Sequence, residues 1–475
     1  MLEKRDFYIN GQWVAPAKPN DFAVIDPSTE EQCAVISLGD QADTDAAVAA
    51  ARAAFDSWSQ TSKAERTALL AKLLEIYNAR AEEMAQAMSM EMGAPIDLSR
   101  AQQVGAGSWH LEGFLKAFEG FSFERDYTAT EKTLLEPIGV CALITPWNWP
   151  MNQIVLKAVP AMATGCTMVL KPSEIAPLSG LLFAEFVHEA GFPPGVFNLV
   201  NGDGAGVGSQ LSAHPEVDMV SFTGSTRAGI AISKAAADTL KRVSLELGGK
   251  GANIIFEDAH PKAAKAGAIR CFRNTGQSCN APTRMLVHKS RYDEAVEMAA
   301  ETAKATHVGP ASEEGRHIGP LVSKAQFDKV QALIETGMQE ARLVAGGLGR
   351  PDGLNRGFYA KPTVFADVTN DMTIAREEIF GPVLSIIPFE SEEEAISIAN
   401  DTPYGLTNYV QTEDDEKRRR VARRLRSGMV ETNGQGFAQG SPFGGYKQSG
   451  NGREGGTYGL EEFLEVKAVS GWAAE

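Results

Sequence analysis

The sequence predicts an α/β fold, with a Rossmann-like doubly wound parallel sheet followed by a second α/β section. The main observation is that short apolar runs alternate with helical segments from residue 138 onward. Strands that are apolar on both faces are typical of a parallel sheet that helices cover on each side. The chain is also 475 residues long, which exceeds what one hydrophobic core usually serves. We therefore expect two or three domains.

Helices are predicted for most of the chain before the sheet begins. Residues 43–45 can cap an alanine-rich helix that ends near Trp58. Residues 63–92 place leucines on one face and predict a single amphipathic helix, which Gly93 terminates. Strands are expected at 140–145, 167–171, 196–200, 219–223, 243–247 and 253–256, with helices at 152–163, 177–190 and 226–237 between several of them.

Composition limits the classes of partner. A formal net charge of −16 argues against binding to nucleic acid or to an anionic membrane, since both favour basic surfaces. No apolar run is long enough to span a bilayer, and the N-terminal residues do not resemble a signal peptide. The five cysteines form no CxxC pair, and the seven histidines show no metal-ligand spacing. We expect a cytoplasmic protein without a metal; an organelle matrix reached through a lost transit peptide is the alternative.

Cys279 is the candidate nucleophile. It follows the Gly276-Gln277 pair, so irregular backbone that exposes the sulfur is expected. A thiol attacks as the thiolate, and a nearby base can supply that form. Glu246 lies between two leucines and before two glycines, which favours a desolvated carboxylate whose raised pKa suits a general base. The alternatives are a buried structural cysteine and a solvated or paired carboxylate.

Two loops after predicted strands carry further polar candidates. Asn148 lies in the segment 145–150 between two tryptophans and two prolines, which hold its amide rigidly, although a turn asparagine alone is a weak signal. Residues 222–226 run from a strand end to a helix N-terminus, where the N–H groups and the helix dipole favour a pyrophosphate. The glycine-rich stretch 202–208 does not match GxGxxG in any register.

These segments, together with 400–406 and 441–450, resemble the aldehyde dehydrogenase family over nearly the whole chain. The resemblance implies that Cys279 attacks an aldehyde to form a thiohemiacetal, which is then oxidised to a thioester. It also implies that Glu246 activates the water that hydrolyses the thioester. The Asn148 amide and the Cys279 backbone N–H would form the oxyanion hole, and each such donor can be worth roughly 3 kcal/mol in the transition state.

The same resemblance implies an NAD cofactor. It places Lys171 and Glu174 on the adenosine ribose hydroxyls, and a glutamate there should repel a 2′-phosphate, so NAD is preferred over NADP. It places Glu378 and Phe380 at the nicotinamide ribose and ring. The expected cofactor-binding residues are Thr145, Pro146, Trp147, Lys171, Ser173, Glu174, Gly204, Phe222, Thr223, Gly224, Ser225, Leu247, Glu378 and Phe380.

The resemblance also implies a division of the chain. Residues 121–136 alternate between polar and apolar side chains, and by themselves they predict a β-hairpin. In the family such a hairpin and a C-terminal strand, here 463–469, form an oligomerisation arm, and exposed strand edges usually need a partner. We expect a homodimer or homotetramer, with 1–117 and 138–248 as the NAD-binding domain, 249–449 as the catalytic domain, and 118–137 and 450–475 as the arm.

Five residues bear on the identity of the aldehyde. Semialdehyde dehydrogenases of the family carry an arginine at the position of Arg273 and a second one where this chain has Leu156. Arg273 is therefore either a substrate residue or a locally paired structural arginine. Trp149, Leu156, Phe437 and Phe443 would give an aromatic and aliphatic entrance. The expected substrate is a medium-chain aliphatic aldehyde, an aromatic aldehyde or a semialdehyde.

Two other functions are weighed against hydrolytic oxidation. A CoA-acylating semialdehyde dehydrogenase would transfer the acyl group to CoA, but a base for water at Glu246 argues against it. A non-catalytic ligand-binding protein on the same fold would have no use for Cys279, Glu246 and Asn148 together.

Overall fold

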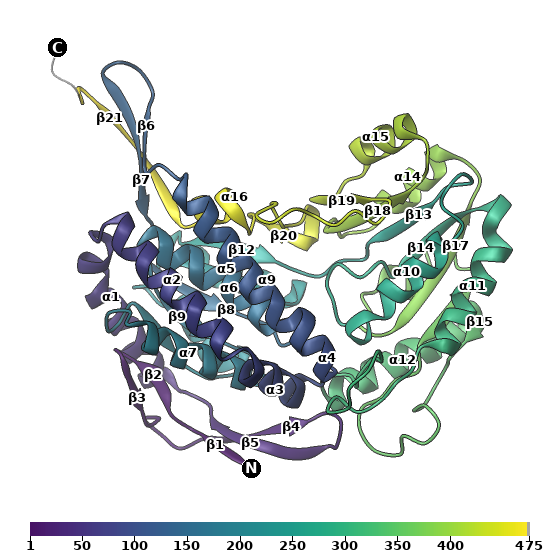
Figure 1. Cartoon of the computed structure of the whole chain (residues 1–475), viewed down its shortest axis with the longest axis horizontal. Coiled ribbons are helices and arrows are strands. Elements are labelled where there is room, and N and C mark those ends of the chain that lie inside the picture. The colour runs from purple at the N-terminus through teal and green to yellow at the C-terminus, as the bar shows by residue number, and fades with distance from the viewer. Residues whose placement is uncertain (473–475) are drawn as a thin grey trace.

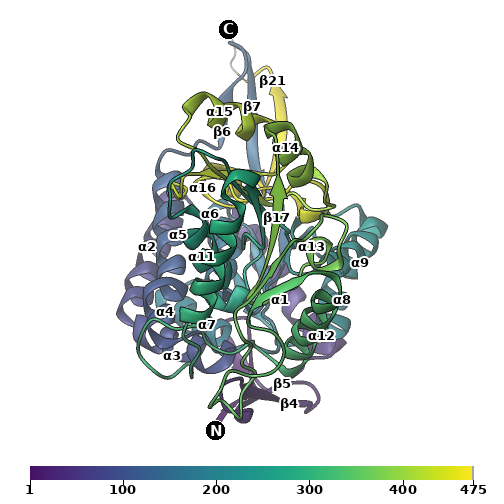
Figure 2. The same ribbon diagram turned by 90° about the vertical axis from the view of Figure 1, so that its right-hand side faces the viewer.

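The computed structural model describes residues 1–472, and residues 473–475 at the end of the expected arm lie outside the described residues. Two large sheets flanked by helices dominate the molecule (Figures 1 and 2). The N-terminal half of the chain surrounds the first sheet, and the green segments of Figure 1 surround the second. The predicted α/β class is therefore confirmed.

The first sheet has eight strands, of which the middle five are parallel. The sequence predicted these five to within one residue, but it did not predict the antiparallel strands that extend both edges. In sheet order the strands are β20 (Gly450–Asn451), β12 (Arg242–Glu246), β11 (Met219–Thr223), β8 (Val140–Ile144), β9 (Thr167–Lys171), β10 (Phe197–Leu199), β2 (Phe7–Ile9) and β3 (Gln12–Val14).

Strand β8 shows why helices cover both faces of this sheet. Cys141 and Leu143 are buried in the core that contains α6 (Pro150–Thr164), whereas Val140 and Ala142 are buried on the other face, where α1 (Gln41–Ser59) packs. Successive side chains of a strand point to opposite faces, so a fully apolar strand needs cover on each. This is the doubly wound arrangement that the apolar runs predicted.

The second sheet has seven strands, all parallel except the edge strand β15. Helix α10 (Ala263–Phe272) leads from this sheet toward the candidate nucleophile, and α12 (Lys324–Glu340) packs near its edge. In sheet order the strands are β15 (Arg342–Ala345), β16 (Thr363–Ala366), β17 (Val383–Phe389), β14 (Arg284–His288), β13 (Ala252–Ile255), β18 (Thr407–Gln411) and β19 (Met429–Thr432).

Two three-stranded sheets complete the fold. The predicted hairpin is present as β6 (Glu124–Asp126) and β7 (Glu131–Pro137), and β21 (Leu464–Ser470) pairs antiparallel with β7 along its whole length. This sheet projects from the rest of the molecule in Figure 1. The sequence did not predict the other sheet, which consists of β1 (Leu2–Lys4), β5 (Glu31–Ser37) and β4 (Asp21–Asp26).

The N-terminal helices differ from the prediction at two points. Residues 63–92 form two helices, α2 (Lys63–Ala79) and α3 (Ala81–Met92), because Arg80 leaves helical geometry with φ −107° and ψ 22°. Helix α3 ends at Gly93 as predicted, in a left-handed conformation. Helix α1 is capped by Asp40, one turn earlier than expected. None of the helices in the described part of the chain is both long and apolar enough to cross a bilayer.

Candidate active site

The candidate residues gather where neighbouring strands of the first sheet end. The register pairs Phe222 of β11 with Ile144 of β8, and Thr223 of β11 with Glu246 of β12. The loop that carries Asn148 therefore starts beside the ends of β11 and β12. Ligands of doubly wound sheets bind at this edge, outside the carboxyl ends of the strands.

The segment before Cys279 has an unusual backbone. Asn274, Thr275 and Gly276 have φ values of 51°, 58° and 71°, three left-handed residues in succession. Gly276 has to be glycine, because a Cβ there would lie 2.0 Å from the carbonyl oxygen of Gly381. Left-handed backbone is unfavourable for the other two residues, so surrounding contacts must hold the segment in place.

The Asn148 loop supplies those contacts. Asn274 Nδ2 donates to the Asn148 carbonyl at 3.1 Å, and Trp149 Nε1 donates to Ser278 Oγ at 2.8 Å. Asn148 Nδ2 donates to the Gln277 carbonyl at 3.1 Å. An amide nitrogen carries two hydrogens, so one N–H of Asn148 fixes the nucleophile segment and the other can serve a ligand.

Cys279 is half-buried between two cavities. The first, of about 180 Å³, brings Cys279 together with Asn148 and Glu246, and we call it the Glu246 cavity. The second, of about 250 Å³, contains Cys279 and Arg273, and we call it the Arg273 cavity. The three residues predicted to carry the chemistry are thus brought together, with the thiol accessible from both sides.

The electrostatics of the free site favour protonated groups. Burial raises the pKa of the Cys279 thiol, and the carboxylates of Glu378, Glu246 and Glu454 raise it further. Burial also raises the pKa of Glu246 well above its ordinary value, with Glu454 adding to the effect. Neither carboxylate oxygen of Glu246 has a hydrogen-bond partner among the described residues. Ionising the thiol therefore requires a proton acceptor or a positive charge in the site.

A buried ion pair close to Glu246 was missed by the sequence analysis. Lys157 of α6 and Glu454 bond to each other, and their side chains are 1% and 6% exposed. Lys157 lowers the pKa of Glu246, whereas Glu454 raises it. The two partners are 297 positions apart, so no local pattern pointed to them.

The Glu246 cavity contains many of the residues expected to bind the nicotinamide end of a dinucleotide. The Trp147 and Phe380 rings meet edge to face with centroids 5.5 Å apart. Glu378 Oε1 accepts from the Gly249 N–H at 2.8 Å, and the missed residue Lys329 donates to the Glu378 carbonyl at 2.8 Å. The expected residues in its lining are Pro146, Trp147, Thr223, Gly224, Ser225, Leu247, Glu378 and Phe380.

The other expected cofactor residues lie outside that lining. Lys171 is buried, and its Nζ donates to the carbonyls of Pro172 and Gly202 at 2.9 and 2.6 Å and faces Glu174 at 3.5 Å. Gly204 begins a short π-helix capped by Asp203. Thr145, Ser173 and Phe222 are also buried outside the cavity.

The Arg273 cavity differs in part from the expected entrance. Trp149, Arg273 and Phe443 line it, but Leu156 and Phe437 do not. Leu156 is 2% exposed because α6 is buried on every side, and Phe437 is 42% exposed. The sequence analysis did not single out the other seven lining residues, most of which lie close to Asn148 or Cys279 in sequence: Ala106, Asn152, Gln153, Arg270, Ser278, Asn280 and Ala281.

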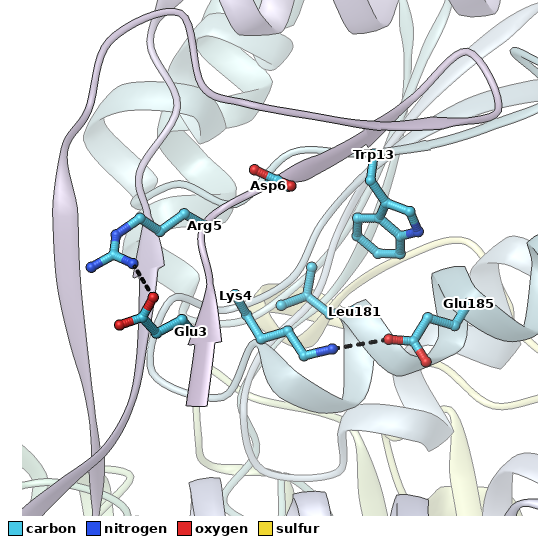
Figure 3. A pocket seen from close by; sticks show the side chains of 7 residues that line it. All are labelled: Glu3, Lys4, Arg5, Asp6, Trp13, Leu181 and Glu185. Atoms are coloured by element: carbon cyan, nitrogen blue, oxygen red, sulfur yellow. Dashed lines mark hydrogen bonds and ion pairs between the residues drawn. The ribbon is translucent and has the colours of Figure 1, made fainter. Parts of the chain in front are cut away.

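A larger hollow lies elsewhere, on the N-terminal strands. Figure 3 shows Lys4 paired with Glu185 at 3.0 Å and Arg5 paired with Glu3 at 3.2 Å. Lys4 and Arg5 are each paired with a glutamate, and the lining residues of this hollow include no cysteine. We therefore assign the active site to the two cavities at Cys279.

A two-sheet α/β fold with polar residues at the carboxyl edge of its parallel strands is an architecture of dehydrogenases. The model of the aldehyde dehydrogenase family matches residues 13–469, so the chain belongs to the aldehyde dehydrogenase family and is an oxidoreductase.

Three relatives illustrate the match. The chain is 54% identical to 3-succinoylsemialdehyde-pyridine dehydrogenase from Pseudomonas sp, over 99% of both chains. It is 59% identical to an aldehyde dehydrogenase of Bartonella henselae, with a TM-score of 0.99 over 99% of this chain and 100% of that one. It is 51% identical to aldehyde dehydrogenase C of Pseudomonas syringae, solved as a cysteine-to-alanine mutant with NAD+ and octanal, with a TM-score of 0.98 over 99% and 97%.

Proposed function

We propose that the protein oxidises an aldehyde to the carboxylic acid with NAD+ and water, through a covalent intermediate on Cys279. The observation that carries the proposal is that one thiol opens onto both the Glu246 cavity and the Arg273 cavity. A cofactor on one side and an aldehyde on the other would then meet at the sulfur. The mutant of P. syringae aldehyde dehydrogenase C solved with NAD+ and octanal supports this reading.

The Glu246 cavity fits the nicotinamide end of NAD. Two aromatic rings, Trp147 and Phe380, offer apolar surfaces, and Glu378 is an acceptor for ribose hydroxyls. Ser225 caps the N-terminus of α9 (Thr226–Ala236), whose N-terminal N–H groups suit a pyrophosphate. Gly248 also leaves room, since a Cβ there would lie 2.3 Å from Glu378 Oε2.

The adenosine end is proposed to contact Lys171, Ser173, Glu174 and Gly204. The carboxylate of Glu174 lies beside Lys171 Nζ at 3.5 Å, so it is held near the edge of β9. A 2′-phosphate would add negative charge next to it, which favours NAD over NADP.

The residues of the chain would act in sequence. Cys279 Sγ loses its proton to solvent and attacks the aldehyde carbon, so that a C–S bond forms and the electron pair of the C=O π bond moves to the oxygen. The resulting oxyanion accepts from the free N–H of Asn148 Nδ2 and from the Cys279 backbone N–H. Bound NAD+ supplies the hydride acceptor that oxidises the carbon. Glu246 then removes a proton from the water that attacks the thioester, which releases the acid and the thiol.

The substrate is proposed to be a medium-chain aliphatic aldehyde, an aromatic aldehyde or a semialdehyde. The side chains of Trp149 and Phe443 form apolar walls of the Arg273 cavity. Arg273 is exposed and makes no ion pair with the described residues, which favours its reading as a substrate residue over that of a locally paired arginine. A P. syringae relative was solved with octanal, and a Pseudomonas relative is a semialdehyde dehydrogenase.

The CoA-acylating function is the second candidate. Glu246 and Cys279 line the same cavity, which favours attack by water on the thioester over attack by a bulky thiol. Adding CoA to the reaction and assaying acyl-CoA separates the two: acyl-CoA formation that replaces the free acid would refute hydrolysis.

The domain limits, assembly and location are also proposals. We assign 1–117 and 138–248 to NAD binding, 249–449 to the catalytic domain, and 118–137 with 450–475 to an oligomerisation arm. Homo-oligomerisation is supported by Tyr127 and Val466, which are 77% and 69% exposed on the arm. A cytoplasmic location is supported by five free cysteines.

The test is NADH formation across aldehydes of graded length and charge, with Cys279→Ala as the blank. We expect NADH and the free acid from the native protein and neither from the variant. NADH formation by Cys279→Ala at the native rate would refute the proposal.

A further inference from the structure

The amide of Asn152 occupies a defined place in the Arg273 cavity. Asn152 lies in the first turn of α6 and lines this cavity with Cys279 and Arg273. A polar side chain among Trp149 and Phe443 is unexpected in a cavity meant only for an alkyl chain, because its hydrogen-bonding capacity would be left unused.

The oxygen of the Asn152 amide already has a hydrogen-bond partner. His110 Nε2 lies 2.8 Å from Asn152 Oδ1. Burial lowers the pKa of His110 to about 4, so near neutral pH the ring is uncharged and has a single N–H. That N–H donates to Oδ1 in the observed pairing, and Trp109 packs against the ring with centroids 4.9 Å apart. His110 therefore fixes which end of the amide faces away from α5 (Val104–Glu119).

The nitrogen of the Asn152 amide is a donor without a partner among the described residues. Asn152 Nδ2 makes no hydrogen bond with any residue that the structure describes, although Asn152 lines the cavity. The neighbouring Gln153 has a different task, since its Oε1 accepts from Thr223 Oγ1 at 3.2 Å toward the Glu246 cavity. The donors of the Arg273 cavity that lack a hydrogen-bond partner among the described residues thus include the Asn152 amide and the Arg273 guanidinium.

We propose that Asn152 determines specificity by donating a hydrogen bond to an acceptor that the aldehyde carries beyond its reacting carbonyl, with His110 as its positioning residue. The substrate class is then an aldehyde bearing a second carbonyl or a similar acceptor rather than a plain alkyl aldehyde. The inference rests on the proposed function. A site built around a donor disfavours a substrate that leaves the donor unpaired.

The test compares three aldehydes of similar length. Hexanal has no second acceptor, 5-oxohexanal has an uncharged one, and 5-oxopentanoate has a carboxylate. We expect Asn152→Leu to lower kcat/KM for 5-oxohexanal relative to hexanal about tenfold, mainly through the KM for 5-oxohexanal. For 5-oxopentanoate the loss should be larger in Arg273→Leu than in Asn152→Leu, which separates the carboxylate from the uncharged acceptor.

Variants of His110 test the positioning role. His110→Gln keeps a donor for Asn152 Oδ1 and should retain the preference for 5-oxohexanal, whereas His110→Leu should lose it. The proposal is overturned if Asn152→Leu leaves the ratio of the two substrates unchanged, or if it abolishes turnover of hexanal as well. Absence of NADH from the native protein with every aldehyde would instead refute the proposed function itself.

Discussion

Glu91 gives a quantitative prediction about stability and pH. Its side chain is fully buried in α3, and its two oxygens accept from the backbone N–H groups of Leu178 and Ser179 at the start of α7 (Leu178–Ala190). Helix α7 has no side-chain cap of its own, so Glu91 satisfies two of its unpaired donors. The loop just before α7 carries Ser173 and Glu174, the proposed adenosine contacts.

The direction of the pH dependence of stability follows from the pKa of Glu91 in the folded and unfolded states. Burial raises the pKa of Glu91 to about 7, against 4.5 for the unfolded chain. The folded state therefore binds this proton more tightly, and the contribution of Glu91 is most favourable below pH 4.5. It declines as pH rises and is lost above pH 7. A difference of this size corresponds to about 3 kcal/mol of unfolding free energy.

The perturbation is Glu91→Gln, which resembles the protonated carboxyl in shape and does not titrate. Urea unfolding of both proteins between pH 4.5 and 8 measures the difference in unfolding free energy. We expect the native protein to lose about 3 kcal/mol relative to the variant over this range. The exposed carboxylate Glu112 supplies the control, since Glu112→Gln should keep the native pH dependence. Parallel curves for native protein and Glu91→Gln would refute the assignment of a raised pKa.

Four further outcomes are expected at the active site. Glu246→Gln should slow steady-state turnover about 10²–10⁴-fold, because thioester hydrolysis loses its base, and it should keep a burst of NADH. The absence of a burst in quenched-flow assays would contradict this prediction. The same variant should speed iodoacetamide labelling of Cys279 at fixed pH, since removing a carboxylate lowers the pKa of the thiol; a slower reaction would contradict it. Gly248→Ala should raise KM for NAD+ at least several-fold, because the new Cβ displaces Glu378. Gly249→Ala should instead reduce kcat, because its Cβ would lie 2.5 Å from the Cys279 carbonyl. If both variants changed KM and kcat equally, the assignment of Gly248 to the cofactor side and Gly249 to the nucleophile would be wrong. Arg273→Leu should weaken selection of carboxylated over plain aldehydes about tenfold, and an unchanged ranking would show that Arg273 does not contact the substrate.

The parts of the fold that could be predicted are those whose side-chain pattern is compatible with only one secondary structure. Strands β8, β9 and β11 are buried at every residue, so their apolar runs give both their class and their limits. Strand β1 is exposed at all three residues and has no such pattern. The break between α2 and α3 could not be predicted either, because Arg80 is a good helix former and its deviation is stabilised by ion pairs to distant residues such as Glu185.

The active-site residues also divide into those that the sequence could predict and those that it could not. The positions of Cys279, Glu246 and Asn148 followed from short segments that each carry their own turn or strand signal. Lys329 and the Lys157–Glu454 pair are delivered by tertiary packing from remote elements, and nothing in their local sequence distinguishes them from surface residues. Asn152 is the exception: it lies four residues after Asn148, at the start of a predicted helix, so its closeness in sequence could have placed it near Cys279.

The short connection between the two sheets explains why the thiol is reachable from both cavities. Strand β12 ends at Glu246 and β13 begins at Ala252, so the chain crosses from one sheet to the other within a few residues. Gly248 packs against Glu378, and Gly249 packs against the Cys279 carbonyl. The same crossing therefore carries the proposed base, leaves space for the carboxylate at the nicotinamide end, and sets the distance to the nucleophile. A side chain at either glycine would separate these groups, which is why the crossing needs two glycines rather than one.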